Sequence, residues 1–392
     1  MLPNPLDKKY PSIRILSDRG IRQALDYGMI KVHPSLENDA KRIQPATLDV
    51  KLCNIDEAWG LPDESGNAKR WGENQTFYAR NMMTANLTEA VDIGQLSKTG
   101  FHEFFGLSTE ARSSLRRLGC YISNPGFFFT TADNQSQVEI GNFSHNDIHF
   151  EKGDRIAQIF FHARPFQDYG ILSFGTDEEQ KEARKKGEMI RSLDMGIEVR
   201  SNRQLRELQS KGFFEIFPKL ELRRGSICVH ASRTAYRMKK IEGGIIFKDR
   251  DKYSPDVLLE PIDISKGYAI RQFEHIIIET EEQLKLSPHI GIRFWDNLRF
   301  ITEGMKSYRH LRDVEESAQN IEFSSLTDGW VDPGYVGGFS RQPKWLGKRI
   351  VHPGDVVGFG QVFFFPNGVG KAYGDASLGS QYLGKGKTEF RK

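Results

Sequence analysis

The apolar positions of residues 17–28 and 202–212 recur every three to four residues, which is the spacing of a short amphipathic helix. In the first segment Ile21 and Leu25 fall on one face, and Ser17 can cap the start. Each segment ends at a glycine, the residue that most often terminates a helix. The pattern therefore predicts two short helices of similar design, one in each half of the chain.

Between residues 30 and 166 the pattern changes to short apolar runs separated by Gly, Pro, Asn and Asp, which is typical of strands and turns. The clearest runs are 47–52 (TLDVKL), 126–131 (GFFFTT) and 155–162 (RIAQIFFH). Similar runs return at 244–247, 268–273, 275–278 and 356–365. We therefore expect a mainly β protein with a few peripheral helices.

Residues 175–193 are highly charged and rich in helix-forming residues, which predicts a solvent-facing connecting helix. On either side, a helix precedes many strands, and each series contains a Gly-Asp turn opening an apolar strand: EKGDRIAQI at 151–159 and HPGDVVGFG at 352–360. This order indicates an internal duplication. We expect a first domain over 1–175, the connecting helix over 176–194 and a second domain over 195–392.

The composition restricts the function classes. With 38% hydrophobic and 27% charged residues, and no apolar run of 18 residues, the 392-residue chain is typical of a globular protein without membrane-spanning helices. The 55 basic and 52 acidic residues leave a net charge of only +3, which argues against binding to nucleic acid. Three widely spaced cysteines and an N-terminus without a signal-peptide pattern predict a cytoplasmic location.

Residues 111–119 (ARSSLRRLG) place three arginines and two adjacent hydroxyls directly after a predicted strand. Guanidinium forks and serine hydroxyls at a turn suit phosphate oxygens. An exposed basic helix start explains the same composition equally well. The segment is therefore a candidate phosphate site with a structural alternative.

Residues 328–338 (DGWVDPGYVGG) predict a glycine-rich hairpin that presents Asp332 beside the rings of Trp330 and Tyr335. A carboxylate next to aromatic rings suits recognition of a base or sugar, although an ordinary D-P-G turn has the same sequence. Asp49 lies inside an alternating strand, where a charge requires a bonding partner. The tail at 373–387 is rich in glycine and lysine, so it could close over phosphates or simply fray.

Taken together, these segments resemble the dCTP deaminase and dUTPase superfamily. The matching motifs are ILSDRGIRQAL (15–25), QPATLDVKL (44–52), ARSSLRRLG, GWVDPGY (329–335) and the tail YGDASLGSQYLGKG (373–386). The chain is about twice the length of one family subunit, so it is most similar to the long, duplicated form of the 2'-deoxycytidine 5'-triphosphate deaminases. The resemblance implies tandem β-clip (dUTPase-like) domains, with sites between adjacent units and a trimer-like or dimeric homo-oligomer.

The resemblance also implies an activity: hydrolytic deamination of dCTP to dUTP and ammonia, with a glutamate activating water, Mg²⁺ accompanying the triphosphate, and no zinc. No C-x-x-C pair is present for the zinc chemistry of other nucleobase deaminases, and the pair His145 and His149 has no third ligand nearby in sequence. Matching the motifs residue by residue makes Glu139 the general base, supported by Ser113 and Arg117. The substrate-binding residues implied in the same way are Arg112, Ser114, Asp332, Tyr335, Gln381, Tyr382 and Lys385.

The two halves depart from the family pattern in complementary ways. The first half lacks the D-P-G-aromatic turn, whereas the second lacks an R-S-S motif and has no carboxylate near residues 340–342, where the glutamate is expected. We therefore expect one composite site, with phosphate residues from one half and the hairpin from the other. A dUTP pyrophosphatase, alone or bifunctional, with Asp332 as the base, and a non-catalytic deoxynucleotide-binding relative remain the alternatives.

Overall fold

A computed structural model describes most of the chain. The described residues are 13–36, 40–60, 70–71, 75–93, 105–122, 129–130, 136–163, 176–252, 255–270, 274–296, 327–342 and 349–375. Among them, no helix combines the length and the apolar character needed to cross a membrane. The predicted tail residues Gln381, Tyr382 and Lys385 lie outside the described residues.

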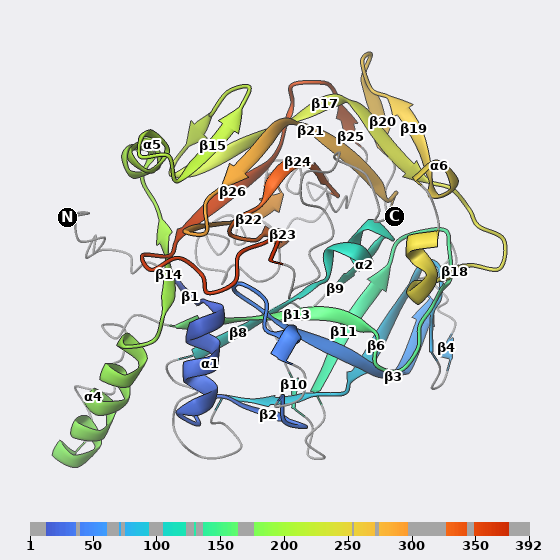
Figure 1. Cartoon of the computed structure of the whole chain (residues 1–392). Helices are drawn as coiled ribbons and strands as arrows, with labels where there is room; N and C mark the ends of the chain where they lie inside the picture. The colour runs from blue at the N-terminus through green and yellow to red at the C-terminus, as the bar shows by residue number, and fades with distance from the viewer. Residues whose placement is uncertain are drawn as a thin grey trace.

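The protein is mainly β, as predicted, with antiparallel pairing almost throughout (Figure 1). The strands of the first half are β1 (Arg14–Leu16), β2 (Lys31–His33), β3 (Leu48–Gly60), β4 (Arg70–Trp71), β5 (Thr76–Phe77), β6 (Asn81–Leu87), β7 (Ala90–Asp92), β8 (Phe105–Ala111), β9 (Cys120–Ile122), β10 (Phe129–Thr130), β11 (Ser136–Asn142), β12 (Ile148–His149) and β13 (Arg155–Ala163).

Most strands of the second half lie in the upper part of the view in Figure 1. They are β14 (Met195–Val199), β15 (Phe214–Phe217), β16 (Leu222–Arg223), β17 (Ser226–Met238), β18 (Ile245–Ile246), β19 (Leu259–Asp263), β20 (Tyr268–Ile270), β21 (Ile276–Leu286), β22 (Ile290–Asp296), β23 (Thr327–Val331), β24 (Val336–Arg341), β25 (Arg349–Val351) and β26 (Val356–Phe364). The helices are α1 (Asp18–Asp26), α2 (Ser113–Arg117), α4 (Asp177–Arg191), α5 (Asn202–Ser210) and α6 (Pro255–Leu258), with 3-10 turns η1 (Ala40–Arg42) and η4 (Phe247–Lys252).

The two helices predicted from apolar spacing are confirmed as α1 and α5, each nine residues long. Ser17 accepts a hydrogen bond from the backbone N–H of Gly20 at 3.1 Å, and Ser201 accepts one from Gln204 at 3.1 Å. Both side chains thereby satisfy N–H groups that a helix start leaves without partners. The charged helix α4 is also confirmed, and in Figure 1 it extends away from the strands.

The strand expected at 244–247 is only partly formed. Strand β18 covers Ile245 and Ile246, and the chain then turns into η4 at Phe247. The Phe247 ring is buried and stacks on Phe150 with ring centroids 4.7 Å apart. Packing of this ring against the first half therefore ends the strand earlier than the apolar pattern predicts.

Equivalent backbone hydrogen bonds in the two halves confirm the duplicated fold. The backbone N–H of Leu52 donates to Asp154 O at 2.8 Å, and that of Ala231 donates to Asp355 O at 2.9 Å. Both aspartates follow the glycines of the two Gly-Asp turns, Gly153 (φ +95°) and Gly354 (φ +80°). The strands that follow, β13 and β26, are nine residues long and pair antiparallel with β3 and β17 respectively.

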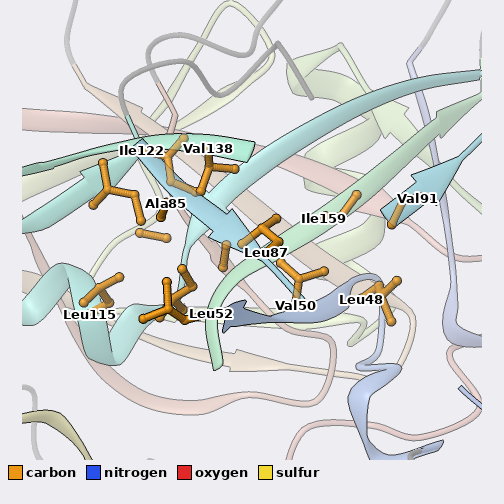
Figure 2. Close-up of a cluster of buried hydrophobic side chains, with 14 of the residues drawn as sticks. Leu48, Val50, Leu52, Ala85, Leu87, Val91, Leu115, Ile122, Val138 and Ile159 are labelled. Carbon is orange, nitrogen blue, oxygen red and sulfur yellow. The ribbon is translucent and has the colours of Figure 1, made fainter. Parts of the chain in front are cut away.

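Two apolar clusters form the cores of the two halves, and the first cluster also contains residues of the second half, among them Met238, Phe247 and Ile277. In the first cluster, side chains from β3, β6, β7, β9, β11, β13 and α2 pack together, and Figure 2 shows ten of them labelled, among them Val50, Leu87, Leu115 and Val138. A second cluster fills the other half. Strand β14 pairs with both β1 and β26, so the sheets of the halves are continuous there. The structure does not test the exact domain boundaries, which stay a prediction.

Candidate active site

A pocket lies where α2 of the first half faces the hairpin β23–β24 of the second. Residues distant in the sequence meet there, because the buried side chains of Leu115 and Leu118 anchor α2 in the first core, while Tyr335 and Phe339 of the hairpin belong to the second. The lining residues are Ser113, Arg116, Arg117, Phe294, Gly329, Trp330, Val331, Asp332, Tyr335, Phe339, Ser340, Arg341, Gln342 and Tyr373.

The lining is positively charged. Three arginines, Arg116, Arg117 and Arg341, contribute guanidinium groups, and Asp332 is the only carboxylate among the described lining residues. The hydroxyls of Ser113 and Ser340 add neutral hydrogen-bonding groups. Guanidinium groups form paired hydrogen bonds with phosphate oxygens, so the lining is suited to an anion such as a polyphosphate.

Aromatic rings form the other part of the pocket. The hydroxyl of Tyr335 donates a hydrogen bond to the carbonyl of Gly338, which fixes the ring within the hairpin. Tyr373 packs edge-on against this ring, with centroids 5.4 Å apart. Gly334, at φ +89°, holds the predicted D-P-G turn, where a side chain would meet Ala372 and Tyr373. The hairpin therefore presents a fixed aromatic surface, which suits a sugar or base.

Asp332 occupies an unusual electrostatic environment. Trp330 Nε1 donates a hydrogen bond to Asp332 Oδ1 at 2.8 Å. Although part of the residue reaches the surface, protein encloses the carboxyl group, and this desolvation raises its pKa to about 7. The Trp330 hydrogen bond and the charge of Arg112 act in the opposite direction, and the charge of Asp49 raises the pKa further. A carboxyl group with this pKa can exchange a proton near neutral pH.

Arg112, which is expected to bind substrate, is absent from the pocket lining, and its expected role stays a prediction. Its Nη1 lies 2.9 Å from Asp49 Oδ2, and Arg155 Nη1 lies 3.4 Å from the same oxygen. Asp49 is 1% exposed, so its carboxylate requires a counter-charge. The two arginines are the bonding partners that its position inside a strand predicted. Desolvation raises the pKa of Asp49, and the neighbouring arginines oppose that shift. Ser114 is buried and also lies outside the pocket lining.

Glu139 is likewise not among the lining residues. It lies in β11 opposite Thr84 of β6, and its side chain is half-buried. Because side chains alternate along a strand, the buried Val138 and Ile140 face the first core and Glu139 faces the opposite side of the sheet. The structure therefore joins Ser113, Arg117, Asp332 and Tyr335 in one pocket but does not bring Glu139 to them.

The strand register identifies the counterpart of Glu139 in the second half. Leu87 of β6 pairs with Leu52 of β3, and Thr280 of β21 pairs with Ala231 of β17. Leu52 and Ala231 are the two residues that donate to the Gly-Asp turns, so they occupy equivalent places. It follows that Leu87 and Thr280 are equivalent, and that β6 and β21 are equivalent strands.

Ala85, two residues before Leu87 in β6, pairs with Val138 of β11. Ile278, two residues before Thr280 in β21, pairs with Arg341 of β24. The next residues along those strands, Glu139 and Gln342, are therefore counterparts. Gln342 is 4% exposed, and its Nε2 donates to Ser340 Oγ at 3.1 Å. The pocket thus contains a neutral amide at the position where the other half has a carboxylate.

Several lining residues were not predicted as site residues: Arg116, Phe294, Phe339, Ser340, Arg341, Gln342 and Tyr373. Gln342 could have been found by counting along the second hairpin from the D-P-G turn. Phe294 and Arg341 carry no local signal, because an apolar or basic residue in a strand is ordinary. In the described part of the chain, no group of three or more His, Cys, Asp and Glu side chains is placed to hold a metal ion.

Comparison with known proteins adds independent information. No protein-family model matches the chain. The dUMP-forming dCTP deaminase of Aquifex aeolicus is 30% identical over 152 residues, which cover 38% of this chain and 80% of that protein. The dUMP-forming dCTP deaminase of Dictyoglomus thermophilum is 26% identical over 163 residues, covering 38% of this chain and 79% of that protein.

The fold has a solved neighbour of matching length. The crystal structure of 2'-deoxycytidine 5'-triphosphate deaminase from Agrobacterium tumefaciens aligns over 91% of this chain and 99% of its own, with a TM-score of 0.58 and 13% identity. At that identity the likeness concerns the fold alone. The sequence match that covers four-fifths of the Aquifex protein decides the family: this chain belongs to the dCTP deaminases.

Proposed function

We propose that this protein hydrolytically deaminates dCTP, giving dUTP and ammonia, with the nucleotide bound in the pocket between α2 and the β23–β24 hairpin. The observation that carries the proposal is the meeting of Ser113 and Arg117 with Asp332 and Tyr335 in one pocket of one chain. These residues belong to the two motifs that the sequence assigns to phosphate and to sugar or base. Family membership supports the substrate class.

The arginines would hold the triphosphate. Arg116, Arg117 and Arg341 supply fixed positive charge, and Ser113 supplies a hydroxyl beside them. Tyr335 would pack against the deoxyribose, since its hydroxyl is already engaged by Gly338 and its ring is fixed. Binding in this orientation would hold the pyrimidine ring near the hairpin and reduce the entropy cost of the reaction.

Asp332 is our candidate for the general base in this pocket. In its ionised form it would accept a proton from the water that attacks C4 of cytosine, and the proton would then pass to the departing ammonia. A pKa of about 7 suits both transfers. A role for Glu139 as the base remains a prediction that requires a different pocket, formed by the opposite face of its sheet or by a second copy of the chain.

Mg²⁺ would enter with the substrate. In nucleotide sites it is usually bound by phosphate oxygens, waters and one or two carboxylates, and the described lining offers Asp332 as a single carboxylate. This donor set fits a cation carried mainly by the triphosphate. When bound, the cation would neutralise part of the phosphate charge. A homo-oligomer and a cytoplasmic location remain predictions.

A second activity, release of pyrophosphate from dUTP, is favoured by the position of Asp332. The carboxylate lies in a lining that contains three arginines, where it could activate water for attack on a phosphate. The relatives from Aquifex and Dictyoglomus are named as dUMP-forming. The non-catalytic alternative predicts nucleotide binding without either product.

The test is incubation of the full chain with dCTP and Mg²⁺, with ammonia, pyrophosphate and nucleotides measured separately. Deamination alone gives ammonia and dUTP in equal amounts, whereas the combined activity gives ammonia, pyrophosphate and dUMP. With dUTP as substrate, pyrophosphate release would identify the second activity. Binding of dCTP without any product would overturn the proposal and leave the binding-only alternative.

A further inference from the structure

Behind the pocket, a buried polar bridge connects the two halves of the chain. It consists of Tyr121 in β9 and His275, which precedes β21, exposed by 4% and 6% respectively. The hydroxyl of Tyr121 lies 3.0 Å from His275 Nδ1 and 3.2 Å from the backbone oxygen of Gln342. His275 Nε2 lies 3.3 Å from the backbone oxygen of Arg117.

The chemistry of the bridge determines its proton arrangement. Burial lowers the pKa of His275 to about 4, so the imidazole is neutral at physiological pH and carries one N–H. The oxygen of Arg117 can only accept, which assigns that hydrogen to Nε2 and leaves Nδ1 as an acceptor. The hydroxyl of Tyr121 then donates, and its single proton is shared between His275 Nδ1 and the oxygen of Gln342.

Both ends of the bridge are backbone groups of pocket residues. Arg117 ends α2 on one wall, and Gln342 follows β24 on the other. The space around the bridge is tightly filled: at Gly119, which has φ +86°, an added Cβ would lie 3.2 Å from the His275 ring and 3.0 Å from Ser144. The backbone that follows α2 therefore has little free space next to His275.

The bridge is not needed merely to hold the halves together. Strand β14 already pairs with strands of both halves. A separate apolar cluster also joins them, with Phe160 packed edge-on against Trp330 at 5.5 Å. What the bridge adds is a direct connection between the walls of the pocket.

We propose that Tyr121 and His275 are positioning residues that set the separation of the Arg117 and Gln342 walls, and hence the fit of the nucleotide. The proposal rests on the proposed function to the extent that this pocket must bind dCTP. Neither side chain is among the lining residues, so each acts through the backbone of a residue that is.

The primary test is Tyr121→Phe, measured by the Kd for dCTP with Mg²⁺, the KM, the kcat and the thermal midpoint. This change removes the hydroxyl but keeps the ring, which packs against Phe143 with centroids 5.7 Å apart. We expect the Kd and KM to rise about tenfold, the effect of one buried hydrogen bond. The kcat should change less, because no reacting group is removed.

Asn146→Ala is the matched control. Asn146 is 1% exposed and also bridges the halves, donating to Lys239 O at 2.8 Å and accepting from the N–H of Ile241 at 2.6 Å, but it does not line the pocket. It should lower the thermal midpoint at least as much as Tyr121→Phe does and leave the Kd unchanged. A Kd that is the same in Tyr121→Phe and the parent protein, or that rises equally in both variants, would overturn the proposal.

Two substitutions of His275 provide a second readout. In His275→Gln the amide nitrogen can replace Nε2 and donate to Arg117, whereas in His275→Asn the amide oxygen can replace Nδ1 and accept from Tyr121. Each should recover part of the affinity lost in His275→Ala, and equal affinities in all three would contradict the bridge. If the parent protein itself does not bind dCTP, both the proposed function and the positioning role are wrong.

Discussion

The two halves of this protein share a backbone framework but differ in the chemistry they carry. In both, a Gly-Asp turn leads into a nine-residue strand that pairs antiparallel with a thirteen-residue strand. Only the first half contributes the arginine-rich α2, and only the second contributes the D-P-G-Y hairpin. The pocket exists because the missing part of each half is supplied by the other.

Equivalent positions show how the two halves differ. Asp49 of β3 pairs with Gln158 of β13, and Cys228 of β17 pairs with Phe359 of β26. Asp49 and Cys228 therefore occupy equivalent positions in the two halves. Asp49 is a buried charge held by two arginines. Cys228 is equally buried, and desolvation, then the nearby Glu221, raises its thiol pKa to about 11, so it stays neutral. A buried carboxylate is present where the arginine motif can neutralise it, and a neutral group occupies the equivalent position in the half without that motif.

The largest difference between the halves is expected in kcat, when Asp332→Asn is compared with Glu139→Gln. Loss of the proton acceptor in the pocket should lower kcat about 10³-fold, while dCTP binding survives. Glu139→Gln makes the same chemical change on the other hairpin and should cost less than tenfold. Steady-state kinetics on both variants provide the measurement. The reverse ranking would make Glu139 the base and move the reaction out of this pocket.

Asp49→Ala, compared with Cys228→Ala, tests the structural difference between the halves. Removing Asp49 leaves Arg112 and Arg155 without their shared counter-ion, which should lower the free energy of unfolding by about 3 kcal/mol. Cys228→Ala removes only one small buried group and should cost about 1 kcal/mol. Urea unfolding of both variants gives the comparison, and equal losses would show that the ion pairs contribute nothing specific.

Arg117→Ala tests whether α2 binds phosphate. Loss of one guanidinium group from the pocket should weaken dCTP binding by about 2 kcal/mol, or about thirtyfold. Ser113→Ala should weaken it less, because a neutral hydroxyl forms weaker hydrogen bonds to phosphate. Calorimetry with dCTP and with deoxycytidine separates the phosphate contribution from that of the nucleoside. An equal loss of affinity for both ligands would exclude the phosphate role.

The pH dependence should be set by Asp332. Its carboxyl must be ionised to accept a proton, so kcat/KM should rise about tenfold per pH unit below 7 and level off above it. The contribution of Asp332 to the free energy of unfolding should instead decrease as the pH rises. The pKa is raised on folding, so the stability that protonated Asp332 contributes is complete below about pH 4 and disappears as the pH rises to 7. Asp332→Asn should remove this part of the pH dependence of unfolding, and an unchanged profile would contradict the assignment.

Local patterns in the sequence were sufficient for several of the described elements, although not for the end of β18. Serine caps and terminal glycines define α1 and α5, because capping depends on residues within one turn of the helix end. The D-P-G-Y hairpin and the apolar strands β13 and β26 depend in the same way on turn chemistry and alternation. The motif order also indicated the duplication and a composite site.

Only the tertiary structure decided which chemical groups meet. Arg112 and Arg117 belong to one motif, yet the first pairs with buried Asp49 and the second lines the pocket. Glu139 faces away from its own core, and the register places Gln342 in the pocket at the equivalent position. These outcomes depend on contacts and strand pairings between residues more than fifty positions apart. Local propensity contains no information on such pairings, because their energy arises only when distant segments of the chain have folded and packed together.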